Sequence, residues 1–154
     1  MRLPILTALL ACAALSACGD DGAPPAAPPT AATDAEKQAR LASLPAPYNT
    51  ADLANGQRQF ALCRSCHTLT EGGSDMTGPN LHGLFGRKAA THGEYKYSDG
   101  LKAAGITWDA ASLDAWIESP RTVVPGTKMA FAGVKDPKNR VDLIGYLKAE
   151  VGDN

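Results

Sequence analysis

The stretch Cys63-Arg64-Ser65-Cys66-His67 decides the fold of this chain. Two cysteines three positions apart, with a histidine directly after the second, form the pattern through which a haem is attached covalently by two thiols. The histidine then lies beside the iron, where an imidazole nitrogen serves as an axial ligand. The motif therefore predicts one haem c bound through Cys63 and Cys66, with His67 as the first iron ligand.

Other proteins use two cysteines at this spacing for different chemistry. A thioredoxin-like dithiol lies in a strand–helix–strand pattern, and a zinc site needs further cysteine or well-spaced histidine ligands. The sequence shows no such strand pattern around the motif, and its two other cysteines, Cys12 and Cys18, lie near the N-terminus. Covalent haem attachment therefore explains the motif better than either alternative.

A six-coordinate iron needs a second axial ligand besides the histidine of the motif. Four residues could provide it: Met76, His82, His92 and Met129. Met129 lies in the segment 125–133, which a proline stiffens and two glycines bracket, and this suits a thioether held on a fixed loop. Methionine is also a common core filler, so the residues alone leave the choice among the four open.

Helix start and stop signals predict an all-α fold of short helices and loops. Capping residues followed by apolar residues at helical spacing mark the starts, and prolines mark the ends. Gly- and Pro-rich loops lie between them, without a run of alternating strand residues. Gly56 allows the first helix of the domain to approach another backbone closely. The expected helices are 51–64 with Thr50 as N-cap, 98–104, 109–118, and 137–151 with Asp136 as N-cap.

The first residues have the pattern of a bacterial secretory signal. Arg2 precedes an apolar run at 3–15 that is too short to span a membrane, and small residues follow it. We predict a signal peptide at 1–17. The end of this segment, Leu15-Ser16-Ala17-Cys18, resembles the lipobox of bacterial lipoproteins and predicts lipidation of Cys18. The alternative is ordinary cleavage before Cys18, which leaves a free thiol.

The remaining chain is expected to consist of a tether and one domain. Residues 18–47 comprise the lipidated cysteine and an Ala/Pro-rich segment with few large apolar residues, which predicts a flexible tether. Residues 48–154 suffice for one small domain with a single core. Because only 6% of the residues are aromatic, a buried haem is expected to form part of that core. A net charge of −1 gives no indication of a nucleic-acid partner.

Four blocks of the sequence resemble class I cytochrome c of the mitochondrial and alphaproteobacterial type. They occur in the order of that family and are the segments 63–68, 78–87, 105–108 and 125–133. The resemblance implies the class I cytochrome c fold, in which short helices and loops wrap around one covalent haem and the first and last helices cross. It also implies that Met129 is the second iron ligand, so that Met76, His82 and His92 are ordinary loop residues.

The same resemblance assigns roles to further residues around the haem. It implies that the Pro79 carbonyl accepts the other ring N–H of His67 and thereby fixes the orientation of the imidazole. Arg87, Tyr97 and Trp108 would hold a haem propionate. On the methionine side it implies that Thr127 forms a hydrogen bond and that Phe131 covers the haem edge. The sequence departs from the animal and yeast pattern at two positions, with Trp116 in place of a tyrosine and Leu101 in place of an asparagine.

These assignments imply an electron carrier and not an enzyme, because two axial ligands leave the iron no open position for a substrate. By resemblance, the donor would be a cytochrome bc-type complex and the acceptor a terminal oxidase. The carrier is expected as a monomer on the periplasmic side of a bacterial membrane, held by its lipid, or alternatively soluble in the periplasm. A peroxidase or gas-binding protein would require Met129 to leave the iron, and a redox sensor would require a signalling domain.

Overall fold

The structure is a computed structural model that describes residues 31–154. The predicted signal peptide and the predicted lipidation of Cys18 lie outside these residues. The described part is helical, with two isolated β-bridges and no β-strand, which confirms the all-α prediction. Its elements, in chain order, are α1 (Asp34–Ala42), the 3₁₀ turn η1 (Tyr48–Thr50), α2 (Leu53–Phe60), α3 (Asp99–Ala103), α4 (Ala110–Glu118), α5 (Pro120–Val123) and α6 (Pro137–Val151).

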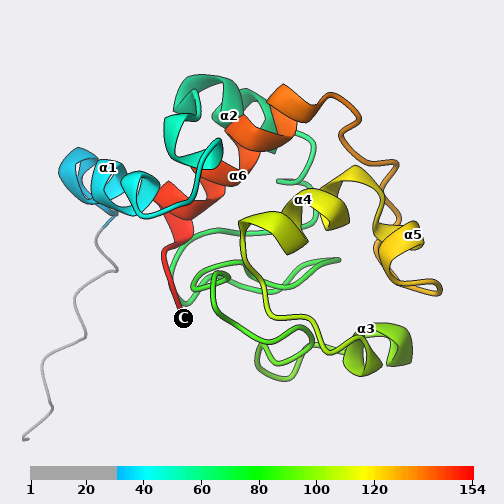
Figure 1. Cartoon of the computed structure of the whole chain (residues 1–154). Helices are drawn as coiled ribbons and strands as arrows, with labels where there is room; N and C mark the ends of the chain where they lie inside the picture. The colour runs from blue at the N-terminus through cyan, green and yellow to red at the C-terminus, as the bar shows by residue number, and fades with distance from the viewer. Residues whose placement is uncertain (1–30) are drawn as a thin grey trace, which may run out of the picture.

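Helix α6 is the element against which α1, α2 and α4 pack. It starts as predicted, with the Asp136 carboxylate accepting from the Asn139 N–H (2.8 Å) and Pro137 at the first position, where its missing N–H costs no hydrogen bond. Leu143 and Ile144, at its centre, are fully buried. Helices α1, α2 and α4 all contact it (Figure 1), so one central helix organises the domain.

The crossing of α2 and α6 depends on Gly56. A Cβ atom built on this glycine would lie 2.1 Å from the Asp142 carbonyl oxygen and 2.5 Å from the Tyr146 Cβ. Only a hydrogen fits between the two backbones. One turn later the Phe60 and Tyr146 rings pack with centroids 5.8 Å apart, as expected for terminal helices that cross. The crossing fixes the direction in which the chain leaves α2.

The predicted bounds of this first helix were wrong at both ends. The N-cap is Asp52, whose carboxylate accepts from the Asn55 N–H (3.0 Å), and not Thr50, which belongs to the turn η1. The helix ends at Phe60 instead of continuing to Arg64, because consecutive tight turns follow it. Asp52 has the stronger local signal, since a cap must lie directly before the helical hydrogen bonds begin.

Asp142 joins α6 to the start of α2. Its side chain is 1% exposed, and its oxygens accept from the Asp52 backbone N–H (2.9 Å), the Asn55 amide (2.8 Å) and the Lys138 ammonium (2.8 Å). Burial alone would raise the pKa of this carboxyl, but these hydrogen bonds outweigh it and hold the pKa below its usual value. The charged form is therefore the one that the fold stabilises.

We expect Asp142→Asn to lower the stability of the haem-loaded protein at pH 7, and to matter less in acid. A carboxyl whose pKa is lower when folded contributes stability above its unfolded value, about 3.9, and loses it as the pH falls through the folded value. The test is urea unfolding at pH 7 and below about pH 4. Asp99→Asn is the matched control, because the Asp99 side chain is fully exposed. If the difference in unfolding free energy between wild type and Asp142→Asn is as large in acid as at pH 7, this account is contradicted.

Helix α1 corrects the prediction of a flexible tether over residues 18–47. Thr33 and Glu36 form a capping box at its start, and Leu41 and Leu44 are buried at its other end. Two leucines packed on a partner helix bury enough apolar surface to order a segment that has good helix formers. The prediction is therefore wrong from Thr33 onward, and the ordered domain begins before residue 48.

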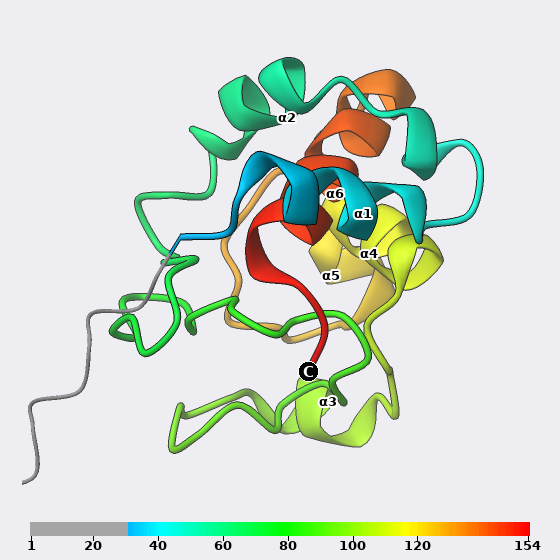
Figure 2. The ribbon, with the colours of Figure 1, turned by 90° about the vertical axis from the view of Figure 1, so that its left-hand side faces the viewer.

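Polar contacts complete the attachment of α1 to the C-terminal end of α6. Arg40 Nη1 donates to the carbonyl oxygens of Ala149 (3.0 Å) and Glu150 (3.3 Å), and Lys37 Nζ lies 2.7 Å from a Glu150 carboxylate oxygen. Carbonyls at a helix end lack partners within the helix and attract positive charge. In Figure 2, α1 lies across the end of α6.

The other short helices follow their predicted starts closely. Ser98 caps α3, and Asp109 forms a reciprocal capping box with Ser112 at the start of α4. Pro120 ends α4 as expected but also begins α5, a single turn that was not predicted. Between residues 31 and 154, no helix is long and apolar enough to cross a membrane. The long loops after α2 and after α5 complete the fold and form most of the site.

Candidate functional site

The cysteine motif follows α2 as a series of turns. The Cys63 N–H donates to the Phe60 carbonyl (2.8 Å), and the His67 N–H donates to the Cys63 carbonyl (3.0 Å). The backbone therefore coils once more after the helix and brings both thiols and the imidazole to one side. Cys63, Cys66 and His67 all line the same internal cavity.

His67 is held by the segment that contains the Gly78-Pro79 pair. Its Nδ1 donates to the Pro79 carbonyl oxygen (2.7 Å), the contact that the resemblance implied. A Cβ on Gly78 would lie 2.3 Å from the imidazole Cε1, so this glycine leaves room for the ring. Burial lowers the pKa of His67, and the hydrogen bond to Pro79 acts in the opposite direction. With Nδ1 engaged, Nε2 is the atom available to an iron.

Among the four candidates for the second ligand, the cavity separates Met129 from the rest. Met129 lines it, whereas the side chains of Met76, His82 and His92 do not, and Met76 is 48% exposed. The Met129 N–H donates to the Thr127 hydroxyl (3.2 Å), and the Thr127 N–H donates to the Val124 carbonyl (3.1 Å). These two bonds shape the loop that presents the thioether.

The cavity gathers all the predicted cofactor-binding residues. It has a volume of about 300 Å³ and is formed by the loops after α2 and α5 together with inward faces of α3, α4 and α6. The predicted residues on its wall are Cys63, Cys66, His67, Pro79, Arg87, Tyr97, Trp108, Trp116, Thr127, Met129 and Phe131. Trp108 and Trp116 pack together there, with ring centroids 5.4 Å apart.

Further apolar residues complete the wall, and sequence reasoning did not assign them to the site. They are Leu62, Leu81, Leu84, Leu113, Ile117 and Leu147. Leucines at helical or loop positions read as ordinary core residues, and only their inward phase on a helix could have suggested a cofactor. Leu101, at the position of the family's asparagine, is 8% exposed and also lines the cavity. The result is a pocket with little polar surface.

Arg87 and Tyr97 supply the polar side of this cavity. The Arg87 guanidinium is buried and donates to the carbonyl oxygens of His82 (2.8 Å) and Asn80 (3.3 Å). Burial lowers the pKa of Arg87, and Tyr97 and Asp75 act in the opposite direction. Burial raises the pKa of the Tyr97 hydroxyl, because it disfavours the charged form. A cation and a neutral hydroxyl on the same wall suit a carboxylate of the ligand.

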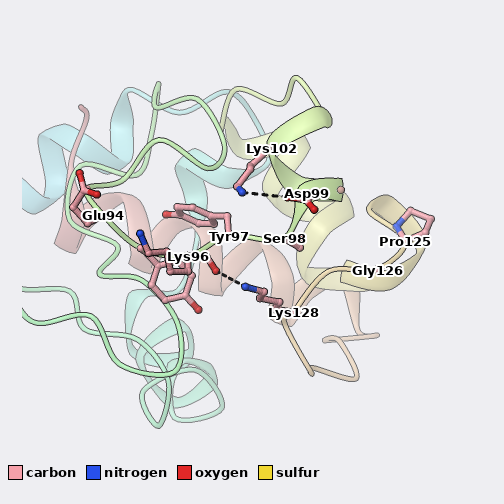
Figure 3. A pocket seen from close by; sticks show the side chains of 12 residues that line it. Glu94, Lys96, Tyr97, Ser98, Asp99, Lys102, Pro125, Gly126 and Lys128 are labelled. Atoms are coloured by element: carbon pink, nitrogen blue, oxygen red, sulfur yellow. Dashed lines mark hydrogen bonds and ion pairs between the residues drawn. The ribbon is translucent and has the colours of Figure 1, made fainter.

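A wider hollow of about 720 Å³ lies beside this cavity, between loop 93–98, α3 and the segment 125–128 (Figure 3). Lys128 Nζ donates across it to the Lys96 carbonyl oxygen (2.8 Å), and Lys102 pairs with Asp99 (3.1 Å). None of the candidate iron ligands lines this hollow. Its structural role is visible in the Lys128 contact, which ties the loop next to Met129 to loop 93–98.

A buried arginine fixes the chain that follows Met129. Arg140 on α6 donates to the carbonyl oxygens of Val134 (3.1 Å) and Lys135 (3.0 Å), and it pairs with Asp114 on α4 (2.9 Å). Gly133 lies in the same stretch with a φ of 93°, and a Cβ there would lie 2.0 Å from the Glu118 carbonyl oxygen. The methionine loop is thus held at both of its ends.

The chemistry of this donor set fits a covalently bound haem. Two thiols, an imidazole and a thioether converge on one mainly apolar cavity. A thioredoxin-like reaction needs a thiolate, but burial raises the pKa of the Cys63 thiol to about 11. For zinc, residues 31–154 contain no group of three or more histidine, cysteine, aspartate or glutamate side chains placed to hold a metal ion. The haem fits the residues, and the two alternatives do not.

Comparisons with known proteins agree with this geometry. Residues 53–149 match the family model for cytochrome c. A cytochrome c of Cochliobolus lunatus is 44% identical over 104 residues, which are 67% of this chain and 96% of the relative. A cytochrome c2 of Blastochloris viridis is 44% identical over 108 residues, 70% of this chain and 85% of the relative. The solved structure of cytochrome cH from Methylobacterium extorquens superposes with a TM-score of 0.61 at 44% identity, over 64% of this chain and 99% of that one.

Proposed function

The chain belongs to the cytochrome c family of electron carriers with one covalently attached haem, and from this premise we propose that it is a membrane-tethered shuttle of a respiratory chain. Its donor is a cytochrome bc-type complex and its acceptor a terminal oxidase. It acts as a monomer on the periplasmic side of a bacterial membrane. The convergence of His67 and Met129 on the cavity that both thiols line is the observation that supports the carrier role.

The two axial side chains explain why the site would carry electrons and not bind substrate. The haem held by Cys63 and Cys66 supplies an iron that gains or loses one electron. His67 and Met129 would both ligate this iron, so it would have no position left for a substrate. Since Pro79 orients the imidazole and Thr127 the methionine loop, the ligand set changes little between oxidation states. A rigid site of this kind exchanges electrons without rearrangement.

The surroundings of the ligands favour a positive reduction potential. Methionine–histidine ligation raises the potential of a haem, and an apolar pocket disfavours the extra positive charge of ferric iron. Trp116 and Leu101 add to this apolar wall, at positions where the family's animal and yeast members have polar side chains. Arg87, Tyr97 and Trp108 hold a propionate, and Phe131 covers the haem edge. Each of these roles rests on the position of the residue on the cavity wall.

The membrane tether rests on the lipobox-like sequence ending at Cys18. Lipidation of this cysteine would keep the protein on the membrane, because several acyl chains hold far more strongly than one. Helix α1 shortens the proposed tether to residues 19–32, which would reach about 43 Å if extended at ~3.1 Å each. Confinement within that distance raises the effective concentration at membrane-bound partners.

We expect Cys18→Ser to release the haem-loaded protein from the membrane fraction while its visible spectrum stays unchanged. The measurement is the partition of the cytochrome between the membrane and periplasmic fractions, combined with its rates of reduction and oxidation on membranes that contain the two respiratory complexes. We expect at least tenfold slower turnover at equal total protein, on the scale of an effective-concentration effect. A wild-type protein found in the soluble fraction would refute the anchor. Anchored protein that exchanges electrons with neither complex would refute the partners.

A further inference from the structure

A chain of side-chain contacts runs from the protein surface to Arg87 on the cavity wall. His92 Nδ1 lies 3.2 Å from Arg87 Nη1, and His92 Nε2 lies 3.2 Å from an Asp75 carboxylate oxygen. A guanidinium can only donate and a carboxylate accepts. The geometry therefore corresponds to a neutral imidazole that accepts at Nδ1 and carries its proton on Nε2.

We propose that His92 is a positioning residue for Arg87, and that its protonation is coupled to the oxidation state of the haem site. Sequence reasoning left His92 as an ordinary loop residue, and its side chain does not line the cavity. It acts through Arg87, which does. This inference rests on the family's one-electron chemistry and is independent of the proposed tether and respiratory partners.

Protonation of His92 changes both the hydrogen bonding and the charge beside the Arg87 guanidinium. A second proton on Nδ1 removes the lone pair that accepts from Arg87 and places another positive charge beside the guanidinium. Arg87 stays attached through the carbonyls of His82 and Asn80, so the main consequence is added positive charge near the cavity. The path from His92 to the cavity runs through Arg87, which is only 8% exposed, so the added charge acts partly through protein and not only through water. It disfavours the ferric state and raises the reduction potential.

The surroundings allow His92 to exchange protons with water while remaining in place. Its side chain is 27% exposed and that of Asp75 35%. Asp75 also accepts from the Asn80 backbone N–H (2.8 Å), which fixes the carboxylate, and Tyr97 lies close enough to bond the His92 backbone. The ionisable groups around the imidazole are thus Asp75, Arg87 and Tyr97. Asp75 and a protonated imidazole carry opposite charges.

Coupling of this kind is reciprocal. When the site accepts one electron from its donor, His92 takes up a fraction of a proton from water, and it returns that fraction on oxidation. The imidazole therefore binds its proton more tightly in the reduced protein than in the oxidised one. The reduction potential falls as pH rises through the range in which imidazoles titrate, about pH 5 to 8.

The decisive variant is His92→Gln in the haem-loaded protein. A glutamine amide can accept from Arg87 with its oxygen and donate to Asp75 with its nitrogen, yet it does not titrate. We expect the potential of the wild type to fall between about pH 5 and pH 8, and that of His92→Gln to lose most of this slope. His82→Gln is the matched control, because His82 contacts Arg87 through its backbone carbonyl, which the substitution keeps, and it should retain the wild-type slope. An undiminished slope in His92→Gln would overturn the proposal.

A second measurement does not depend on substitutions. The His92 ring resonances are followed by NMR against pH in the fully oxidised and fully reduced wild-type protein. We expect the titration midpoint to lie at higher pH in the reduced form. Equal midpoints in the two forms would overturn the coupling, whichever slope the potential shows. Either result stands apart from the anchor, since a protein without its lipid gives the same titration.

Discussion

Gly56→Ala is expected to lower the free energy of unfolding of the haem-loaded protein by about 3 kcal/mol, the upper end of the cost of overpacking a core. In an isolated helix the same change would stabilise by about 1 kcal/mol. Here the added methyl group meets the Asp142 carbonyl oxygen at 2.1 Å and the Tyr146 Cβ at 2.5 Å. The backbone oxygen cannot rotate away, so α2 and α6 must separate. Denaturant unfolding followed by the haem absorption measures the loss.

Gly72→Ala is the control for this prediction. A Cβ on Gly72 has nothing within 4 Å, but its φ of 66° disfavours any side chain, at about 1–2 kcal/mol. A larger loss at Gly56 than at Gly72 isolates the cost of the crowded crossing. Because α2 leads directly into the turns that carry Cys63 and His67, Gly56→Ala should also reduce the yield of protein with attached haem. A Gly56 variant that is as stable as the Gly72 variant would show that the crossing can open without cost.

Local signals explain which parts of the fold could be predicted. The helix-start signals each act within one helical turn, so a sequence window of a few residues contains the whole interaction. They are Ser98, the pair Asp109 and Ser112, and the pair Asp136 and Pro137. The cysteine motif is local in the same sense, because one turn of chain places both thiols and the imidazole. Such features do not depend on distant parts of the chain.

Features that depend on distant partners could not be predicted in this way. Helix α1 has only Leu41 as a large buried residue, with Leu44 just after its end, and the Ala/Pro content of the preceding segment hides this short apolar signal. Its order comes from α6, more than a hundred positions away in the chain, through Arg40 and Lys37. The contact of Asp75 with His92 joins two parts of the long loop after α2, which has no periodicity. In both cases the stabilising free energy comes from tertiary contacts and not from the local sequence.

The apolar wall of the cavity shows a third limit. Leu81 and Leu147 have the same local signature as residues of any small core, and their common role appears only when the chain is folded. The resemblance to the family placed the residues of its motifs, since those carry polar or covalent chemistry. It assigned no role to Leu147, nor to Leu81, although Leu81 lies within the block 78–87. The part of the site that sets its polarity was therefore the part least visible in the sequence.

The largest functional effect is expected for Met129→Ala. Without the thioether, the ferric protein should lose completely the weak charge-transfer band by which an iron–methionine bond is recognised at the red end of the spectrum. The reduction potential should fall, because axial ligands set haem potentials over a range of roughly 0.8 V. The freed position should admit small ligands, so peroxide turnover should appear. Absorption spectra of the oxidised protein and redox titration measure these changes.

Met76→Ala separates the loss of the ligand from the loss of a methionine. Met76 is 48% exposed and does not line the cavity, so its removal should leave the band and the potential at their wild-type values. If the band is absent from the wild type, or if it survives in Met129→Ala, the iron has a different second ligand. His82 and His92 would then be tested next, and peroxidase or gas-binding activity would become the better account of a site with a replaceable ligand.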